Sequence, residues 1–212
     1  MIAHASEICR KRCRMTRMRN FRFKPGLDRA KVGDFALPLG VESLDASPPI
    51  EGYTVRFEEG EDGEQDTYSY QVVVTHERIR GLMHEFFELL SDEVSPVVEI
   101  GSVDAYRSID VYVSEEPHQR EAFLEIWSAF EPILLEEVSI GARVTADEPF
   151  LEVFLDFWKS ITIHSPLEGR SAIEAILERN ELEEVIQTWQ EDPPDELNPP
   201  YQLREILLIE DE

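Results

Sequence analysis

The stretch from Thr67 to Ile140 constrains the fold most, because it alternates between the residue patterns of strands and of helices. Residues 68–75 are rich in β-branched and aromatic side chains, which favour a strand. Residues 79–90 carry large apolar side chains at intervals of three and four, which predicts one buried helical stripe. We then expect a strand at 95–101, a strand at 108–114, a helix over 123–130 and a strand at 134–140. The second helix should carry its own apolar stripe, made of Phe123, Ile126, Trp127 and Phe130.

This order of elements predicts a ferredoxin-like fold with a split βαβ core (βαββαβ). Both helices should cover the same sheet face, because parallel crossovers are almost always right-handed. In this fold the strands at 68–75 and 108–114 are parallel neighbours. Residues 53–57 also have a strand pattern and would form a hairpin with strand 68–75, both of whose edges are already taken. Either the strand at 53–57 lies elsewhere, or the strand order is a variant.

The fold class expected for the whole chain is therefore α+β, with the ferredoxin-like core at 67–140 and an extension over 141–212. The extension should hold a further β-hairpin, a helix and a C-terminal strand. The helix should begin at Ser165-Pro-Leu-Glu168, which has the form of a capping box, and end near Arg179. The hairpin strands are expected at 150–155 and 159–163, with a helix over 149–159 as the alternative; residues 181–189 fit a helix or a strand, and 201–209 fit a last strand.

Charge divides the chain into two unequal parts. Residues 1–32 hold ten Lys or Arg residues against two acidic residues, a net charge of +8. Residues 33–212 hold ten basic residues against 43 acidic ones, a net charge of −33. We expect a disordered basic arm or a mis-assigned start over 1–32, a linker or strap over 33–52 and a single acidic α+β domain over 53–212.

The acidic domain limits the partners to be expected. It should repel nucleic acid and anionic membranes, so nucleic acid would bind only through the basic arm at 10–24. No apolar run approaches the length of a membrane span. The two cysteines, Cys9 and Cys13, both lie in the arm, so the domain has no disulfide framework and a cytoplasmic location is expected.

Polar residues after two of the predicted strands suggest a candidate metal site. If the strands at 68–75 and 108–114 are parallel neighbours, their carboxyl ends emerge side by side. Two imidazoles and a carboxylate suffice to bind zinc with an open coordination position. The competing interpretation is that polar residues favour helix N-termini, and the spacing is far weaker than an H-E-x-x-H motif. The candidates are His76 and Glu77 after the first strand, and Glu115, Glu116 and His118 after the second.

Catalytic and cofactor motifs are missing from the sequence. Gly60 and Gly63 stand among acidic residues that would repel phosphate, and there is no G-x-S-x-G elbow. We therefore expect a non-catalytic binding or regulatory module without a cofactor, whose partner is another protein. The alternatives are a metal-dependent enzyme that uses His76, Glu77 and His118 with a divalent metal, and an acidic mimic of nucleic acid.

Overall fold

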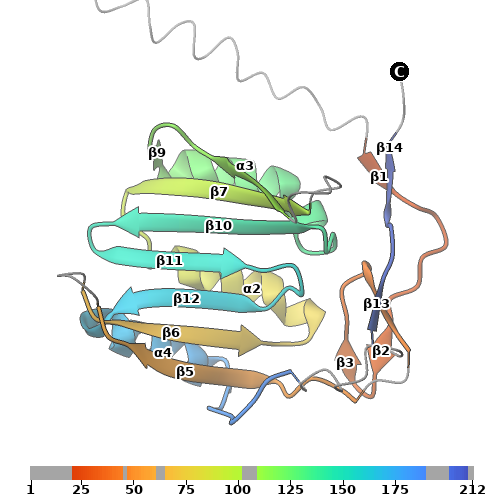
Figure 1. Cartoon of the computed structure of the whole chain (residues 1–212), viewed down its shortest axis with the longest axis horizontal. Helices are drawn as coiled ribbons and strands as arrows, with labels where there is room; N and C mark the ends of the chain where they lie inside the picture. The colour runs from red at the N-terminus through yellow and green to blue at the C-terminus, as the bar shows by residue number, and fades with distance from the viewer. Residues whose placement is uncertain (1–20, 45–46, 61–64, 102–108, 190–200, 210–212) are drawn as a thin grey trace, which may run out of the picture.

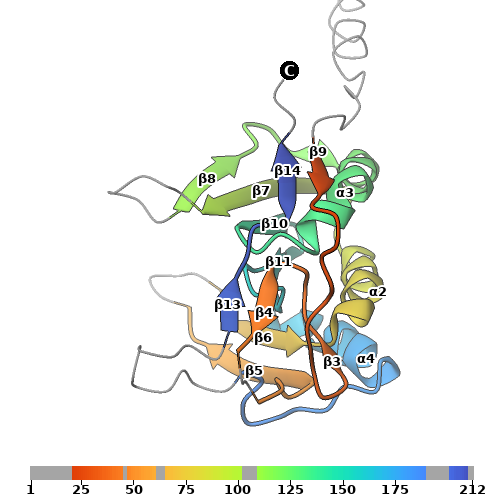
Figure 2. The ribbon, with the colours of Figure 1, turned by 90° about the vertical axis from the view of Figure 1, so that its right-hand side faces the viewer.

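The computed structural model describes residues 21–44, 47–60, 65–101, 109–189 and 201–209. Most of them form one large antiparallel sheet with helices on one face, so the predicted α+β class is confirmed (Figures 1 and 2). The opposite face carries no helix among these residues. The strand order is β5 (Gly52–Glu58), β6 (Thr67–Val73), β12 (Ile161–Pro166), β11 (Phe150–Leu155), β10 (Ile140–Asp147), β7 (Glu93–Gly101) and β8 (Ile109–Val113), with β9 (His118–Gln119) pairing with β7 next to β8.

The helices that cover the sheet are α2 (His76–Phe87), α3 (Arg120–Leu134) and α4 (Arg170–Arg179). The apolar stripe predicted for the first helix is buried, and Phe87 makes edge contacts with Phe123 and Trp127 of α3 at 5.3 and 4.8 Å between ring centroids. The stripe predicted for α3 divides in two. Phe123 and Trp127 are buried, whereas Ile126 and Phe130 are 49% and 43% exposed.

The strand order differs from the ferredoxin-like prediction. β6 pairs with β5 and β12, and not with β8, which lies at the far edge of the sheet. The hairpins of β10, β11 and β12 insert between β6 and β7, because these strands present a continuous apolar side to the helices. That side includes Val144, Val153, Leu155, Ile161 and Ile163, all of them fully or almost fully buried.

The hairpin and the helix predicted for residues 141–212 are present, but some of them begin at other residues than expected. β11 begins and ends where the first hairpin strand was expected, and β12 begins two residues later than expected. The last helix begins at Arg170, after a 3₁₀ turn over Leu167–Gly169, because Ser165 and Pro166 continue β12. In residues 181–189, Glu184 forms an isolated parallel bridge with Tyr53 of β5.

Residues 21–44, which we call the strap, cross one end of the large sheet together with residues 201–209 (Figures 1 and 2). Two two-stranded sheets join these segments, and a third is formed within the strap itself. Residues 21–32, which were predicted to be part of the basic arm, belong to the strap, and residues 1–20 lie outside the described ranges. The pairs are β1 (Phe21–Phe23) with β14 (Leu207–Ile209), β2 (Lys31–Val32) with β3 (Phe35–Ala36), and β4 (Val41–Ser43) with β13 (Tyr201–Leu203).

No helix in the described part of the chain is both long enough and apolar enough to cross a membrane.

The aromatic contact between α2 and α3 gives a test of the core. Phe87 is 1% exposed, so we expect Phe87→Ala to lower the free energy of unfolding by about 3–5 kcal/mol, as other large aromatic truncations in cores do. A urea titration measures the change. Phe57→Ala is the matched control, because Phe57 is 54% exposed and its removal should change stability by less than about 1 kcal/mol. Equal losses in the two variants would contradict this assignment of the core.

Candidate functional site

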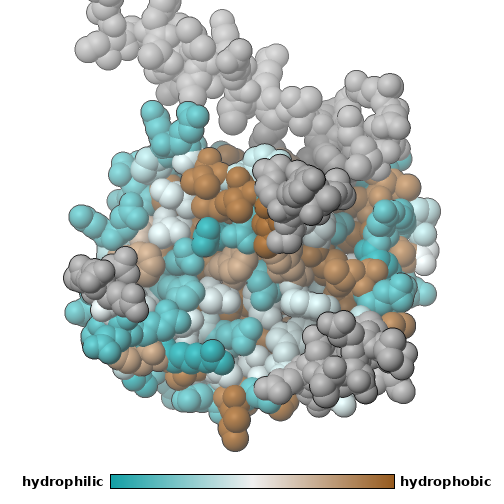
Figure 3. All heavy atoms as spheres, viewed as in Figure 1, coloured by the Kyte–Doolittle hydropathy of each residue, from teal (hydrophilic) through white to brown (hydrophobic). Residues whose placement is uncertain are grey.

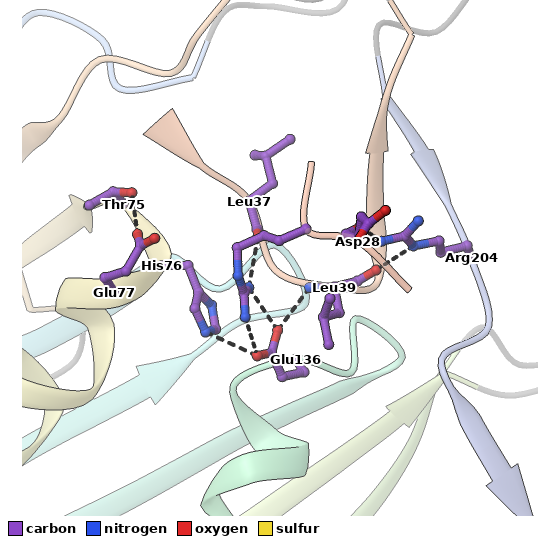
Figure 4. A network of polar contacts seen from close by, with 9 residues as sticks. Asp28, Leu37, Leu39, Thr75, His76, Glu77, Glu136 and Arg204 are labelled. Carbon is purple, nitrogen blue, oxygen red and sulfur yellow. Dashed lines mark hydrogen bonds and ion pairs between the residues drawn. The ribbon is translucent and has the colours of Figure 1, made fainter. Parts of the chain in front are cut away.

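His76 and Glu77 lie at the start of α2, where the strap crosses the sheet (Figure 4). The His76 ring reaches the buried carboxylate of Glu136, with Nε2 3.1 Å from Oε1. Glu77 instead accepts a hydrogen bond from the Thr75 hydroxyl at 2.8 Å and points away from Glu136. The two predicted metal ligands His76 and Glu77 therefore contact different residues and do not face a common site.

Glu136 joins three segments that are distant in sequence. Its carboxylate accepts hydrogen bonds from the Arg29 guanidinium at 2.6 and 3.0 Å and from the Leu39 backbone N–H at 2.8 Å, besides the contact with His76. Burial by itself would raise the pKa of Glu136, but the hydrogen bonds from His76, Arg29 and Leu39 outweigh it and lower the pKa to about 2. These contacts fix the strap against the helices and leave Glu136 ionised.

The other predicted ligands lie at the opposite end of the sheet. His118 Nε2 is 2.7 Å from the Ser114 hydroxyl, and Glu115 and Glu116 are exposed. Every strand pairing between β6 and β8 is antiparallel, and there are five of them, so β8 runs opposite to β6. The carboxyl ends of these two strands therefore lie at opposite ends of the sheet.

The structure thus does not bring His76 and Glu77 together with Glu115, Glu116 and His118. No group of three or more His, Cys, Asp or Glu residues within the described ranges is placed to hold a metal ion. The predicted site depended on β6 and β8 being parallel neighbours, and they are neither parallel nor neighbours.

A second buried charge has a structural role. Lys159, at the turn between β11 and β12, is 3% exposed and donates a hydrogen bond to the Ile140 carbonyl at 2.6 Å. Burial lowers the pKa of Lys159 to about 7 and, at the same turn, raises the pKa of Asp156 to about 6. Asp156 accepts a hydrogen bond from the Ser160 N–H at 2.8 Å. Both side chains are therefore engaged in holding the hairpin turn.

A groove of about 400 Å³, lined almost entirely by apolar side chains, lies between α3 and the strands β7 and β10. We call it the α3 groove. Its position and composition match small apolar binding sites, which are concave and lined mainly by hydrophobic and aromatic side chains. The helix contributes Phe123, Ile126, Trp127, Phe130, Ile133 and Leu134, and the strands contribute Pro96, Val97, Val98, Ile100, Ile140, Ala142 and Arg143, with His118 and Leu207 at the margin.

The α3 groove is unusual in its charge. None of the described residues that line it is Asp or Glu, although residues 33–212 have a net charge of −33. Its two titratable groups are His118, which contacts Ser114, and Arg143, whose guanidinium lies 6.0 Å from the ring centroid of Phe154 and 3.6 Å from each of two carboxylates. The groove therefore suits an apolar group better than an ionic substrate.

The apolar residues of α3 are the sequence signal for this groove. The four residues were predicted to form one helical stripe, yet Phe123 and Trp127 are buried whereas Ile126 and Phe130 are about half exposed. Two adjacent apolar stripes on one helix are more than one sheet contact can bury, and that excess marks a surface available for binding.

Comparisons with models of known families, with curated proteins and with solved structures found no match to this chain.

The network around Glu136 predicts a specific loss of stability in acid. The pKa of Glu136 is lowered from 4.5 to about 2 in the folded state, so its contribution is complete above about pH 4.5 and disappears as the pH falls towards 2. The shift corresponds to roughly 3 kcal/mol. We expect Glu136→Gln to be less stable than the wild type at pH 6 and to approach it at pH 2–3, measured as unfolding free energy in urea.

Glu205→Gln is the control for this prediction. Glu205 pairs with Lys24 at 2.8 Å, but its side chain is 88% exposed, and exposed ion pairs contribute little. Its acid profile should follow that of the wild type. A constant difference between Glu136→Gln and the wild type from pH 6 to pH 2 would show that the carboxylate contributes by packing alone.

Proposed function

We propose that this protein is a non-catalytic binding module that holds an apolar segment of another protein in the α3 groove. The observation that carries the proposal is the groove itself, an apolar depression without a carboxylate on a strongly acidic body. Because the strap network and the Lys159 turn use their charged groups in internal contacts, neither supplies an evident acid, base or nucleophile to the groove.

The energetic reason for binding is the incomplete burial of α3. Ile126 and Phe130 are about half exposed, and Ile100 on the facing strand is 36% exposed. Complete burial of a fully exposed side chain of this kind contributes about 1.5–3 kcal/mol, so covering these three, which are already half-buried or more, contributes roughly 2–4 kcal/mol. A micromolar affinity corresponds to about 8 kcal/mol, so the apolar side chains of the partner and the attraction between opposite charges must supply the rest.

The surroundings define the chemistry of the partner. Glu121 and Glu125 are exposed on α3, the helix that forms one wall of the groove. A segment with one apolar stripe and flanking Lys or Arg residues matches an apolar groove with an acidic rim. We therefore propose a cationic amphipathic segment as the occupant.

A reducing compartment such as the cytoplasm belongs to the same proposal, because residues 33–212 contain no cysteine.

The two alternative functions gain no support from the geometry. A metal-dependent enzyme would need His76 and His118 in one site, and they lie at opposite ends of the sheet. The nucleic-acid mimic stays a prediction from net charge alone.

The proposal is tested with a fluorescently labelled helical peptide built from Leu on one face and Lys on the other. We expect the wild-type protein to bind it with micromolar affinity, measured by fluorescence anisotropy at physiological salt. Ile126→Glu places a carboxylate in the groove and should weaken binding at least tenfold, about 1.4 kcal/mol. A peptide with Glu in place of Lys should not bind.

Ile186→Glu is the matched control, because Ile186 is fully exposed and does not line the groove. It adds the same charge and should leave affinity unchanged. If the Lys peptide binds the wild type and Ile126→Glu equally well, the attraction is that of the acidic body as a whole, and the groove is not the site.

A further inference from the structure

The two edges of the large sheet are treated differently by the chain. At the β5 edge, residues after α4 cover the strand: the Tyr53 N–H donates to the Glu183 carbonyl at 3.0 Å and the Val185 N–H donates to the Tyr53 carbonyl at 2.8 Å. At the other edge, β8 has no strand beyond it in the described part of the chain. Exposed edge strands usually carry charges, proline or a bulge that prevent pairing with other chains.

β8 has little of that protection. Its five residues contain no proline and no lysine, and Asp110 is its one charged residue. Ile109, Val111 and Val113 are 37%, 54% and 64% exposed. They alternate along the strand, so they share one side of the sheet, the side without helices. Figure 3 views that side and shows apolar side chains gathered where β7 and β8 lie.

The outward backbone N–H and C=O groups of β8 are also free of any neighbouring strand in the described part of the chain. The Ser114 N–H donates to the Pro96 carbonyl of β7, and in an antiparallel ladder the backbone groups of alternate residues point in the same direction. Residues 110, 112 and 114 therefore face β7. Ile109, Val111 and Val113 direct their N–H and C=O groups outward, away from the sheet.

We propose that the β8 edge pairs with β8 of a second copy of this chain, antiparallel, with Val111 opposite Val111 on a two-fold axis. This register places each Ile109 opposite Val113 of the other copy. The three opposed pairs consist only of residues whose backbone groups point outward, so each can exchange two hydrogen bonds. A register shifted by one residue would lose this match.

The side chains are self-complementary in the same register. On the helix-free side, Ile109, Val111 and Val113 of both copies form one apolar row, the kind of cross-strand contact that stabilises sheets. On the other side, each Asp110 lies opposite Tyr112 of the other copy, so no like charges are directly opposed. A strand that presents the same residue classes in both directions fits its own copy, which is the requirement of a two-fold interface.

Net charge sets the strength of this association. The chain carries −25, and the two copies repel, but charges more than about 8 Å apart are largely screened at physiological salt. A contact of one short strand also buries less than a standard stable interface. The dimer is therefore weak, and its population rises with salt and with protein concentration.

Sedimentation velocity of the full chain tests the association. We expect a monomer at low concentration and a dimer at high concentration, with more dimer at higher salt. Val111→Pro removes an outward N–H and leaves the bonds from β8 to β7 intact, so it should abolish the dimer while the protein stays folded by circular dichroism. Phe57→Pro is the control, since by alternation from Tyr53 its N–H points outward from the opposite edge.

Cysteine cross-linking tests the register. In a chain with Cys9 and Cys13 replaced by serine, Val111→Cys should form a disulfide-linked dimer on mild oxidation, because opposed residues lie about 5.5 Å apart between Cα atoms. Ile109→Cys alone should not form a linked dimer, whereas an equal mixture of Ile109→Cys and Val113→Cys should.

Three results would overturn the proposal. The first is a monomer at every concentration, and the second is a dimer that Val111→Pro leaves unchanged. The third is self-linkage of Ile109→Cys that is as efficient as self-linkage of Val111→Cys. None of these measurements depends on ligand binding in the α3 groove.

Discussion

The Glu136 carboxylate is the interaction on which the arrangement of the strap depends. It is almost completely buried and receives donors from Arg29 and Leu39 of the strap and from His76 at the start of α2. The backbone carbonyl of Glu136 also accepts the Gly40 N–H at 3.1 Å. Removing one member of such a buried ionic group leaves the others desolvated and unpaired, which is far more unfavourable than the gain from an exposed pair. The strap is therefore positioned by a carboxylate that lies two residues beyond the end of α3.

The two proposed surfaces are neighbours because they share β7. Val98 of that strand lines the α3 groove and lies opposite Tyr112 of β8 in the ladder. One side of β7 thus faces the groove, and its outer edge supports the strand that would join two copies. A partner held in the groove and a second copy at the edge would therefore approach the same corner of the molecule. The acidic remainder of the surface discourages other contacts with anionic molecules.

The predictability of this structure from sequence follows the range of the interactions. The buried stripe of α2 was evident, because it depends on the spacing of neighbouring residues, whereas residues 150–155 fitted both the observed strand β11 and a helix over 149–159. The strand order was not evident, because nothing local shows that Ile161 and Ile163 pair with β6 across about ninety residues. The candidate metal site failed to assemble for the same reason, since it required His76 and His118 to follow adjacent parallel strands. The sequence also could not show that Glu136, and not the adjacent Glu137, forms the buried network. Its partners Arg29 and Leu39 lie about a hundred residues away in the strap.

The pairing of the strap with residues 201–209 affects the order in which the protein can fold during synthesis. Arg204 donates a hydrogen bond to the carbonyl of Leu39, which precedes it by 165 residues, and β13 pairs with β4. At roughly 5–20 residues per second, a ribosome makes Arg204 about 10–30 s after Leu39. During that interval the large sheet can form, whereas β1 and β4 lack the strands β14 and β13 with which they pair. The strap therefore leaves the ribosome before residues 201–209 and can complete its pairing only after the strands of the large sheet have been made.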